Sequence, residues 1–491
     1  MIVRQLERSS RTDSLNKRRY DCLKALIEAI LGWLTDSSQF SLTNFKITRK
    51  FFLMRSDKHS PAPTSSSNGG EAQILSYFGF LTLLIYMSTP TGYLVDIATS
   101  FMLKNQLHAS AEQVANFRFL TAIPAFVAFI FGIVRDRWNP FGLRDRGYFL
   151  IFAPMTGAVF VWLAFGKLQI TSLTLGVILS VITFRFVTAA YQGLMSLIGQ
   201  EKQMSGRLAT IWNIALAIPA LLAAYSSGWV TEHLKPREIF LIMAALCFAL
   251  GIYGLWKQRT VFTHAYDQPR AQHLTLGADV KRLIAHRAIY GAILINFLWN
   301  FAPGASTPLQ YYLTNQLHLP DAAFANYTAI FAASFIPTYI IYGYLCKRVP
   351  QSKLLLWGTV IGVPQMIPLL FVHSSAAAQL MAIPIGLMGG IASAAYFDLA
   401  MRSCPPGLQG TLMMFVDGML ILSSRGGDIL GTKIYDSDKA NGFLYCVIAT
   451  TGVYALILPL LLLVPKNLVA TRDGEDNPEI EKEVLEELTT R

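Results

Sequence analysis

The fourteen residues "LKNQLHASAEQVAN", Leu103 to Asn116, return later in the chain as "LTNQLHLPDAAFAN", Leu313 to Asn326. Seven of the fourteen positions are identical, and the two copies begin 210 residues apart in a chain of 491. A match of this length at such a separation indicates an internal duplication. What has been duplicated depends on the sequence around each copy.

The composition is typical of a membrane protein. Hydrophobic residues make up 53% of the chain and charged residues only 14%, whereas a soluble globular chain has about 25% charged residues. Long apolar runs alternate with short charged patches, and runs of about 20 apolar residues indicate membrane-spanning helices. The runs are too long and too uniformly apolar for barrel strands, so we predict an all-α membrane protein.

The net charge and the cysteines point to no soluble function. The net charge of +11 could indicate nucleic-acid binding, but basic loops on one side of a membrane explain it better. The odd number of cysteines has no metal-binding or disulfide spacing, so we interpret all of them as free thiols. They are Cys22, Cys247, Cys346, Cys404 and Cys446. We therefore expect no metal, no cofactor and no nucleic-acid partner.

From residue 74 onward the sequence predicts twelve membrane spans. Some contain Pro and Gly, as in "MSTPTGY" and "NFAPGAS", which membrane helices tolerate at bends and close contacts. The predicted spans are 75–103, 112–134, 148–166, 172–199, 208–230, 237–256, 287–313, 322–345, 353–372, 376–402, 409–434 and 441–464.

The distribution of Lys and Arg among the short loops predicts the orientation. The loop after span 112–134 holds Arg135, Arg137, Arg144 and Arg146, whereas "NQLHLPDAAFAN" and "HSSAAAQ" hold neither Lys nor Arg. This bias places the basic loops and both termini in the cytoplasm. We therefore expect a multi-pass protein of the plasma membrane.

Both ends of the chain lie outside the span pattern. Residues 1–73 are expected to form a cytoplasmic extension that is disordered or lies on the membrane surface. No secretory signal is evident, Met54 could be the natural start, and we expect residues 1–53 to be dispensable. The acidic tail, 466–491, is expected to be a solvated helix or a disordered end without a functional signal.

The positions of the two copies predict a two-fold organisation. Each copy ends one span and begins the next on the outer side, so the first span corresponds to the seventh. Six helices duplicated in parallel orientation are the arrangement of the major facilitator superfamily, which the chain resembles. We expect one six-helix bundle at 74–257, a cytoplasmic linker at 258–285 and a second bundle at 286–465.

The loop "GIVRDRWNPFGLRDRGYFL" resembles that superfamily's signature between helices 2 and 3. The resemblance implies that Gly132 allows close helix approach and that Asp136 accepts hydrogen bonds from the start of a neighbouring helix. The arginines of the loop would pair with Asp136 across the inner gate, namely Arg137, Arg144 and Arg146. The alternative is a loop that is merely positive inside, but charge alone would not require the Gly-x-x-x-Asp spacing.

Within the superfamily, the chain is most similar to the folate-biopterin transporter family, roughly over residues 75 to 435. Three stretches support this resemblance: "SFMLKNQLHASAEQVA", "FGLRDRGYFL" and "RSCPPGLQGTLMM". The last, Arg402 to Met414, is the most specific, because a double proline followed by glycine at an inner helix boundary is rare. The resemblance implies the superfamily fold and a folate- or pterin-like solute.

The chain also departs from that family. Asp145 replaces an arginine of the loop, and a Lys-Pro pair is missing before Gly132. The acidic residues of the family's fourth helix are absent, and Arg185 and Gln192 stand in that span instead. These departures leave the expected fold intact but weaken the inference about the solute.

Ionisable side chains at membrane depth are costly and usually functional. Arg185 is the candidate anchor for an anion, because a guanidinium binds carboxylates in a bidentate manner. The alternative is a structural ion pair with Asp96, and both hold if the substrate competes with Asp96. We consider Asp96, Asp398 and Asp417 candidate proton-coupling sites, because a lone buried carboxylate can carry a proton. Alternatively, Asp398 and Asp417 simply point into an aqueous cavity.

Uncharged polar residues near these charges are candidate ligands for a flat heteroaromatic solute. Tyr191 and Gln192 lie a turn or more from Arg185, and Asn296 and Asn300 are four residues apart, on one helix face. The alternative is that the amides join membrane helices to one another.

Two further pairs are given a structural interpretation. Arg425 and Asp428 share a helix face, so we predict a local ion pair between them. His108 and His318, which the repeat places at matching positions, precede the helix starts "SAEQ" and "PDAA". A pH-sensing role is possible for these histidines, but we favour a role in starting the helices.

These observations favour a monomeric secondary active transporter in the lipid bilayer. It would move a small organic anion of folate- or pterin-like type by alternating access, with protons as the candidate coupling ion. The alternatives are a non-transporting scaffold of the same fold, or a carrier for an unrelated solute. An enzyme is disfavoured because the sequence has no Ser-His-Asp order, metal-ligand spacing or phosphate loop.

Overall fold

The computed structural model describes residues 68–92, 95, 99, 102–166, 169–262, 276–438 and 440–475. The predictions for Asp96, for residues 1–67 and for most of the acidic tail lie outside these residues. All the elements in the described part are helices, so the all-α prediction is confirmed.

The first half contains the predicted spans 1 to 6. Its second span bends at Val127, where one helix ends and the next begins. The elements are α2 (Asn68–Met87), η1 (Met102–Gln106), α4 (Ala111–Phe126), α5 (Ala128–Arg137), η2 (Pro140–Gly142), α6 (Asp145–Phe165), α7 (Ile170–Glu201), α8 (Ser205–His233) and α9 (Pro236–Tyr253).

Two short helices, α10 (Arg259–Phe262) and α11 (Leu276–Ala285), precede the second half. The second half contains the predicted spans 7 to 12. Its elements are α12 (Ala288–Asn300), α13 (Thr307–Tyr311), η3 (Tyr312–Gln316), α14 (Asp321–Leu345), α15 (Gln351–Gly362), η4 (Val363–Phe371), α16 (Ser375–Arg402), α17 (Gln409–Ser437), α18 (Gly442–Ala455), α19 (Ile457–Leu460), η5 (Leu461–Leu463) and α20 (Lys466–Val469).

Ten helices of the described part are long and apolar enough to cross a membrane. The two remaining predicted spans do not meet this criterion of length and apolar composition, and the structure shows why. Span 7 is divided into α12, α13 and η3 by the non-helical stretch 301–306. α17 contains five charged side chains, Asp417, Arg425, Asp428, Lys433 and Asp436. The order of the elements therefore agrees with a twelve-helix fold.

The repeated stretch adopts the same local structure in both copies. Each copy begins with a π-helical turn, η1 or η3. The turn closes through Leu107 N to Met102 O (2.9 Å) in one copy and through Leu317 N to Tyr312 O (3.0 Å) in the other. This agreement supports the duplication inferred from the sequence.

The histidine that follows each π-helical turn has the same unusual backbone conformation. His108 has φ 46° and His318 has φ 51°, in the left-handed region that few residues other than glycine adopt. The first copy then enters α4 through Ser110, whose side chain and Gln113 form a reciprocal capping box. The predicted role of the histidines before helix starts agrees with this geometry.

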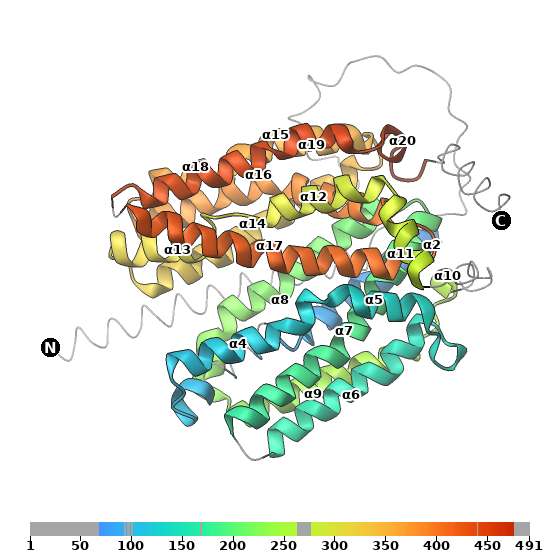
Figure 1. The fold of residues 1–491 in the computed structure, drawn as a ribbon, viewed down its shortest axis with the longest axis horizontal. Coiled ribbons are helices and arrows are strands. Elements are labelled where there is room, and N and C mark those ends of the chain that lie inside the picture. The colour runs from blue at the N-terminus through green and yellow to red at the C-terminus, as the bar shows by residue number, and fades with distance from the viewer. Residues whose placement is uncertain are drawn as a thin grey trace. The chain divides into compact units, whose positions relative to one another are not determined.

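The helices form two groups that lie side by side (Figure 1). In the first group, α6 packs against α7 and α9, and in the second, α14 and α15 pack against α16. Across the boundary, α5 and α7 pack against α17, and α8 packs against α14 and α16. The bounds predicted for the two bundles and the linker stay predictions.

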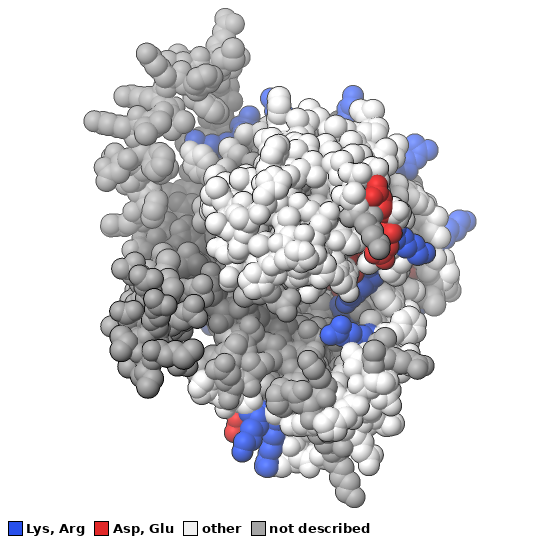
Figure 2. Space-filling model, turned by 90° about the vertical axis from the view of Figure 1, so that its left-hand side faces the viewer, with Lys and Arg blue, Asp and Glu red and all other residues white. Residues whose placement is uncertain are grey.

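The loops that join the helices define two ends of the bundles. We call "the basic end" the end formed by loops 138–144, 202–204, 346–350 and 403–408, and the other end "the opposite end". Figure 2 looks onto the opposite end, where the described surface is mostly uncharged and charged side chains lie in a few separate places. The orientation predicted from the Lys and Arg of the loops stays a prediction.

Candidate functional site

One face of α7 has four polar side chains. Arg185, Gln192, Ser196 and Gln200 are separated by seven, four and four residues, a spacing that places them on one side of a helix. Ser196 Oγ donates to Met401 O at 3.2 Å, and Gln200 Nε2 donates to the same oxygen at 3.0 Å. This face of α7 is therefore directed toward the second half.

The central contact on this face is an ion pair between Arg185 and Asp417. Arg185 Nη1 lies 2.5 Å from Asp417 Oδ2 on α17, and the two side chains are only 13% and 20% exposed. The prediction that Asp417 is a lone carboxylate is wrong, because its charge is compensated from the other half of the molecule. The predicted pairing of Arg185 with Asp96 cannot be followed, since Asp96 is not among the described residues.

Gln192 lies two turns from Arg185 on the same face and has an unpaired acceptor. Its Oε1 is buried and has no hydrogen-bond partner among the described residues. An unsatisfied buried acceptor costs about 1–3 kcal/mol, so such groups are uncommon without a functional reason. Gln192 therefore remains a candidate to bind a solute.

Tyr191 is differently placed. Its hydroxyl lies 2.5 Å from Thr82 Oγ1, and both residues are buried within the first half. The structure thus separates the two residues that the sequence grouped together. Tyr191 joins helices of its own half, whereas Gln192 lies on the polar face of α7.

The asparagines of α12 bind backbone rather than an open space. Asn296 Nδ2 donates to Ala292 O at 2.8 Å and to Tyr396 O of α16 at 3.2 Å. Asn300 Nδ2 donates to Asn296 O at 2.9 Å. The alternative in which amides join membrane helices describes Asn296, while Asn300 bonds only within its own helix.

Asp398 lies near the basic end and is fully buried. It accepts hydrogen bonds from Tyr342 Oη at 2.8 Å and from Arg402 Nε at 3.0 Å. The prediction of a lone carboxylate is therefore wrong for Asp398 as well. It is compensated by the arginine one turn along its own helix.

The predicted ion pair between Arg425 and Asp428 is also wrong. Asp428 instead accepts hydrogen bonds from the backbone N–H and the hydroxyl of Thr307, both at 2.9 Å. Thr307 is the first residue of α13, whose free N–H groups need acceptors. In the part of the chain that the structure describes, Arg425 is exposed and has no ion-pair partner, and the same holds for Arg118 of α4.

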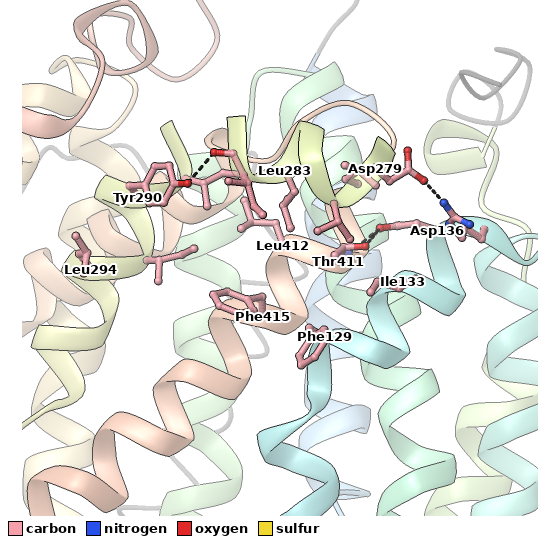
Figure 3. Close-up of a pocket in the computed structure, with 16 residues that line it drawn as sticks. Phe129, Ile133, Asp136, Asp279, Leu283, Tyr290, Leu294, Thr411, Leu412 and Phe415 are labelled. Carbon is pink, nitrogen blue, oxygen red and sulfur yellow. Dashed lines mark hydrogen bonds and ion pairs between the residues drawn. The ribbon is translucent and has the colours of Figure 1, made fainter. Parts of the chain in front are cut away.

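The signature loop binds the first residues of α17, and we call this contact the α17 cap (Asp136, Gly410 and Thr411). Asp136 accepts from Gly410 N at 3.1 Å, from Thr411 N at 2.7 Å and from Thr411 Oγ1 at 2.7 Å (Figure 3). A Cβ on Gly132 would come within 2.4 Å of Gly410 O. The roles implied for Gly132 and Asp136 therefore fit this geometry.

The arginine beside Asp136 is Arg135, which the predicted gate residues did not include. Arg135 Nη1 lies 2.9 Å from Asp136 Oδ1, and its Nε and Nη2 donate to Asp145 at 2.6 and 2.8 Å. All three side chains are buried. Asp145, the departure from the family's loop, thus compensates the buried guanidinium.

The predicted gate arginines make other contacts. Arg137 Nη2 lies 2.5 Å from Asp279 Oδ2 of α11 (Figure 3). Arg146 donates to the carbonyls of Gly254 and Leu255 at 3.0 and 2.7 Å, which satisfies the end of α9. Arg144 has a positive φ of 50° at the start of α6.

The stretch "CPPG" supports the contact between the halves. Gln200 Nε2 of α7 donates to Cys404 O at 2.7 Å, and Gln409 Nε2 donates to Gln200 Oε1 at 3.2 Å. Gly407 has φ 81°, a conformation that favours glycine. The most specific stretch of the family resemblance therefore lies where the two halves meet at the basic end.

An apolar pocket of about 430 Å³ lies beside the α17 cap, among α5, α11, α12 and α17 (Figure 3). Its walls are mostly hydrocarbon side chains such as Phe129, Leu412 and Phe415. Neither Arg185 nor Gln192 lines it. The pocket is therefore separate from the candidate site for an anion.

An aromatic pair that the sequence did not single out also joins the halves. Trp212 of α8 stacks on Phe397 of α16, with ring centroids 3.8 Å apart and an interplanar angle of 8°. Trp212 Nε1 is buried without a hydrogen-bond partner among the described residues. Trp212 is an uncharged residue within a predicted span, so the hydropathy pattern alone could not identify it as a contact between the halves.

Two groups of helices that lie side by side and are joined by polar contacts at mid-depth and at the basic end are the architecture of a major facilitator transporter. Comparison with known proteins agrees. Residues 72–424 match the model of the Major Facilitator Superfamily, and the chain belongs to this family.

Its similarity to two transporters extends over most of each chain. It is 24% identical over 428 residues to the folate-biopterin transporter of Synechocystis sp. (81% of this chain, 84% of that protein). It is 22% identical over 429 residues to folate transporter 2 of Plasmodium falciparum (82% of this chain, 92% of that protein). The resemblance inferred from the sequence is confirmed.

A solved structure shows the same fold. The superfamily transporter FucP, crystallised in the outward conformation, superposes with a TM-score of 0.61 at 14% identity. The match covers 80% of this chain and 99% of that chain. The protein is thus a multi-pass membrane transporter related to folate-biopterin transporters.

Proposed function

We propose that this protein transports a folate- or pterin-like organic anion by alternating access, with Arg185 as the anchor for a carboxylate of the solute. The observation that best supports this proposal is the Arg185–Asp417 ion pair, which joins α7 and α17 across the two halves. The unpaired Oε1 of Gln192 on the same helix face adds a hydrogen-bond acceptor. The solute class comes from the names of the relatives.

Binding would proceed by exchange of carboxylates. A guanidinium accommodates a carboxylate in bidentate geometry, so an incoming anion can displace Asp417 from Arg185. The displacement removes one contact between the halves. A solute shifts a conformational equilibrium only through such a difference in contacts between the two states.

The same exchange would couple transport to protons. Once its cation is taken by the solute, Asp417 is a partly buried carboxylate without compensation. Such a group becomes neutral by taking up a proton, because an unpaired charge in a low-dielectric site is costly. Asp417 is therefore our candidate proton site. Asp398 is less suited to this role, because Arg402 and Tyr342 already compensate it.

Two further cations support an anionic solute. Arg118 and Arg425 lie within α4 and α17 and are exposed in the described structure. Charged side chains at membrane depth face water-filled cavities or the bundle interior rather than lipid. Together with Arg185 they would make the cavity attractive to anions.

The structure has its two halves joined at the basic end. Asp136, Gln200 and Cys404 all take part in contacts between the halves there. We assign the basic end to the cytoplasm on the distribution of Lys and Arg. In this state the solute site would exchange with the opposite end, which is one of the two states of an alternating-access cycle.

Uptake into proteoliposomes tests this function. The purified protein would be given radiolabelled folic acid, a pterin without the glutamate part, and an uncharged sugar, each with and without an inside-alkaline pH gradient. We expect uptake of the carboxylate-bearing solute and stimulation by the gradient. Uptake of the sugar alone, or of none of the three, would contradict the proposal.

A further inference from the structure

The start of α8 is bound by a residue from the end of the described chain. Asp473 accepts hydrogen bonds from Gly206 N at 3.0 Å and from Arg207 N at 3.3 Å. Its carboxylate also lies 2.6 Å from Arg207 Nε and is completely shielded from solvent. We call this contact the α8 cap (Asp473, Gly206 and Arg207). The expectation of a solvated tail is therefore wrong at Asp473.

The backbone contacts of the α8 cap repeat those of the α17 cap. In both, one carboxylate oxygen accepts from the second residue of the helix, a glycine, and the other accepts from the third residue. The residues that precede the helices, Met204 and Leu408, have nearly the same backbone angles and no side-chain cap. Each helix therefore needs an acid from elsewhere to satisfy its N-terminus.

The sequence repeat explains why the two acids come from different places. In the first half, "GIVRDR" begins at Gly132 and supplies Asp136. In the second half, the corresponding stretch "GYLCKR" begins at Gly343, 211 residues later, and has Lys347 at the position of Asp136, whereas a separation of 210 residues places Cys346 there. The loop of the second half therefore has no carboxylate to place at α8. Asp473 supplies it from beyond the last helix.

The segment around Asp473 contacts both halves. Asp473 N donates to Cys346 O of the second half at 2.9 Å, and Gly474 N donates to Gln203 O of the first half at 2.7 Å. Arg402 of α16 donates to Thr471 O at 3.3 Å and lies 3.8 Å from the Asp473 carboxylate. Residues 471–474 thus connect α8 to α14 and α16 at the basic end.

We propose that residues 471–474 are a gate element of the transporter, in which Asp473 holds the basic end closed and leaves α8 when that end opens. By the pseudo-symmetry of the two halves, Asp136 has the equivalent function at the start of α17. Its carboxylate is supplied by the signature stretch itself rather than by a terminal segment. Because Asp473 lies on a terminal segment, it can move away from α8 without the unfolding of a transmembrane helix. The proposal rests on the alternating-access part of the proposed function, but its test requires no solute.

Two native cysteines report separately on the departure of the segment from α8 and on the opening of the basic end. Cys346 Sγ lies 3.9 Å from Asp473 Oδ2, so its reactivity reports departure of the segment. Cys404 is buried at the contact between the halves and binds Gln200 through its carbonyl, so its reactivity reports opening of the basic end. Burial raises the pKa of the Cys346 thiol, which keeps it protonated and unreactive while the segment is in place.

The test compares maleimide labelling of the full chain in detergent, with Cys22, Cys247 and Cys446 replaced by serine. In Asp473→Asn we expect both Cys346 and Cys404 to react about tenfold faster or more than in the parent. The matched control is Glu475→Gln, because Glu475 is half exposed and, among the described residues, forms an ion pair only with Arg472. It should leave both rates unchanged. Unchanged rates in Asp473→Asn, or faster labelling of Cys346 alone, would overturn the proposal.

A second variant distinguishes opening from misfolding. In Asp473→Cys combined with Arg207→Cys and Cys346→Ser, mild oxidation should join the segment to α8 by a disulfide between the two halves, in place of the contact between Asp473 and Arg207. We expect labelling of Cys404 to be fast in the reduced protein, to slow at least severalfold after oxidation and to recover on reduction. A misfolded protein would not recover in this way. Fast labelling of Cys404 in the oxidised, cross-linked protein would show that the segment does not hold the gate.

Discussion

Arg185 of α7 and Asp417 of α17 lie 2.5 Å apart, although 232 residues separate them in the chain. The pair connects the two halves at the middle of the helices rather than at a loop. Both side chains of the pair are partly shielded from solvent. Exchanging one partner therefore changes the electrostatic energy more than it would for a pair at the surface. For a carrier, this pair is a suitable place for a solute to act on the conformational equilibrium.

Replacing Asp417 by Asn should separate binding from proton coupling. The amide can still accept a hydrogen bond from Arg185 but cannot take up a proton. We expect an inside-alkaline gradient, which stimulates the parent severalfold, to have no effect on this variant, while exchange of labelled for unlabelled solute continues. Initial rates with and without the gradient measure this. Retained stimulation in Asp417→Asn would exclude Asp417 as the proton site.

Replacing Asp145 by Asn should destabilise the signature loop. Asp145 binds both Nε and Nη2 of the buried Arg135, and removing one partner of a buried ion pair costs about 3 kcal/mol. We expect a melting temperature several degrees below the parent in detergent. The control Asp436→Asn, at an exposed carboxylate, should melt like the parent. Equal melting temperatures for all three proteins would show that Asp145 contributes no net stability.

Single cysteines test the orientation. With the five native cysteines replaced, positions Gln106 and Gln316 should react with an impermeant thiol reagent added to intact cells. Positions Arg144 and Ser352 should react only after the membrane is opened. Both outer positions are exposed in the structure, so accessibility is not limiting. Labelling of position 144 in sealed cells would reverse the proposed topology.

Much of the fold could be predicted from the sequence because its causes are local. The apolar runs set the helices, and the repeat at Leu103 and Leu313 showed the duplication. The resemblance of the loop to the superfamily signature implied that Asp136 binds the start of a neighbouring helix, which is α17. The repeated π-helical turns and the left-handed His108 and His318 show how closely local sequence determined local structure.

The partners of the charged side chains could not be predicted in the same way. Asp417, Asp398 and Asp428 were each interpreted from their own helix, but all three bind residues of other helices, namely Arg185, Tyr342 and Thr307. Hydropathy gives no information on which helix faces which. The tail was the clearest case: its acidic composition indicated solvation, yet Asp473 is buried because α8 needs an acceptor that its own loop lacks.

The measurement that tests the central claim most directly is the affinity for radiolabelled folic acid of Arg185→Lys and Arg185→Ala. The lysine keeps the charge but loses the bidentate geometry, so we expect Kd to rise about tenfold, and about 10–100-fold for the alanine, since a hydrogen bond to a charged group contributes about 1.5–3 kcal/mol. The control is Arg287→Ala, at an exposed arginine of the basic end, which should bind like the parent. If Arg185→Ala binds and transports folic acid with the parent's affinity and rate, Arg185 is not the anion anchor.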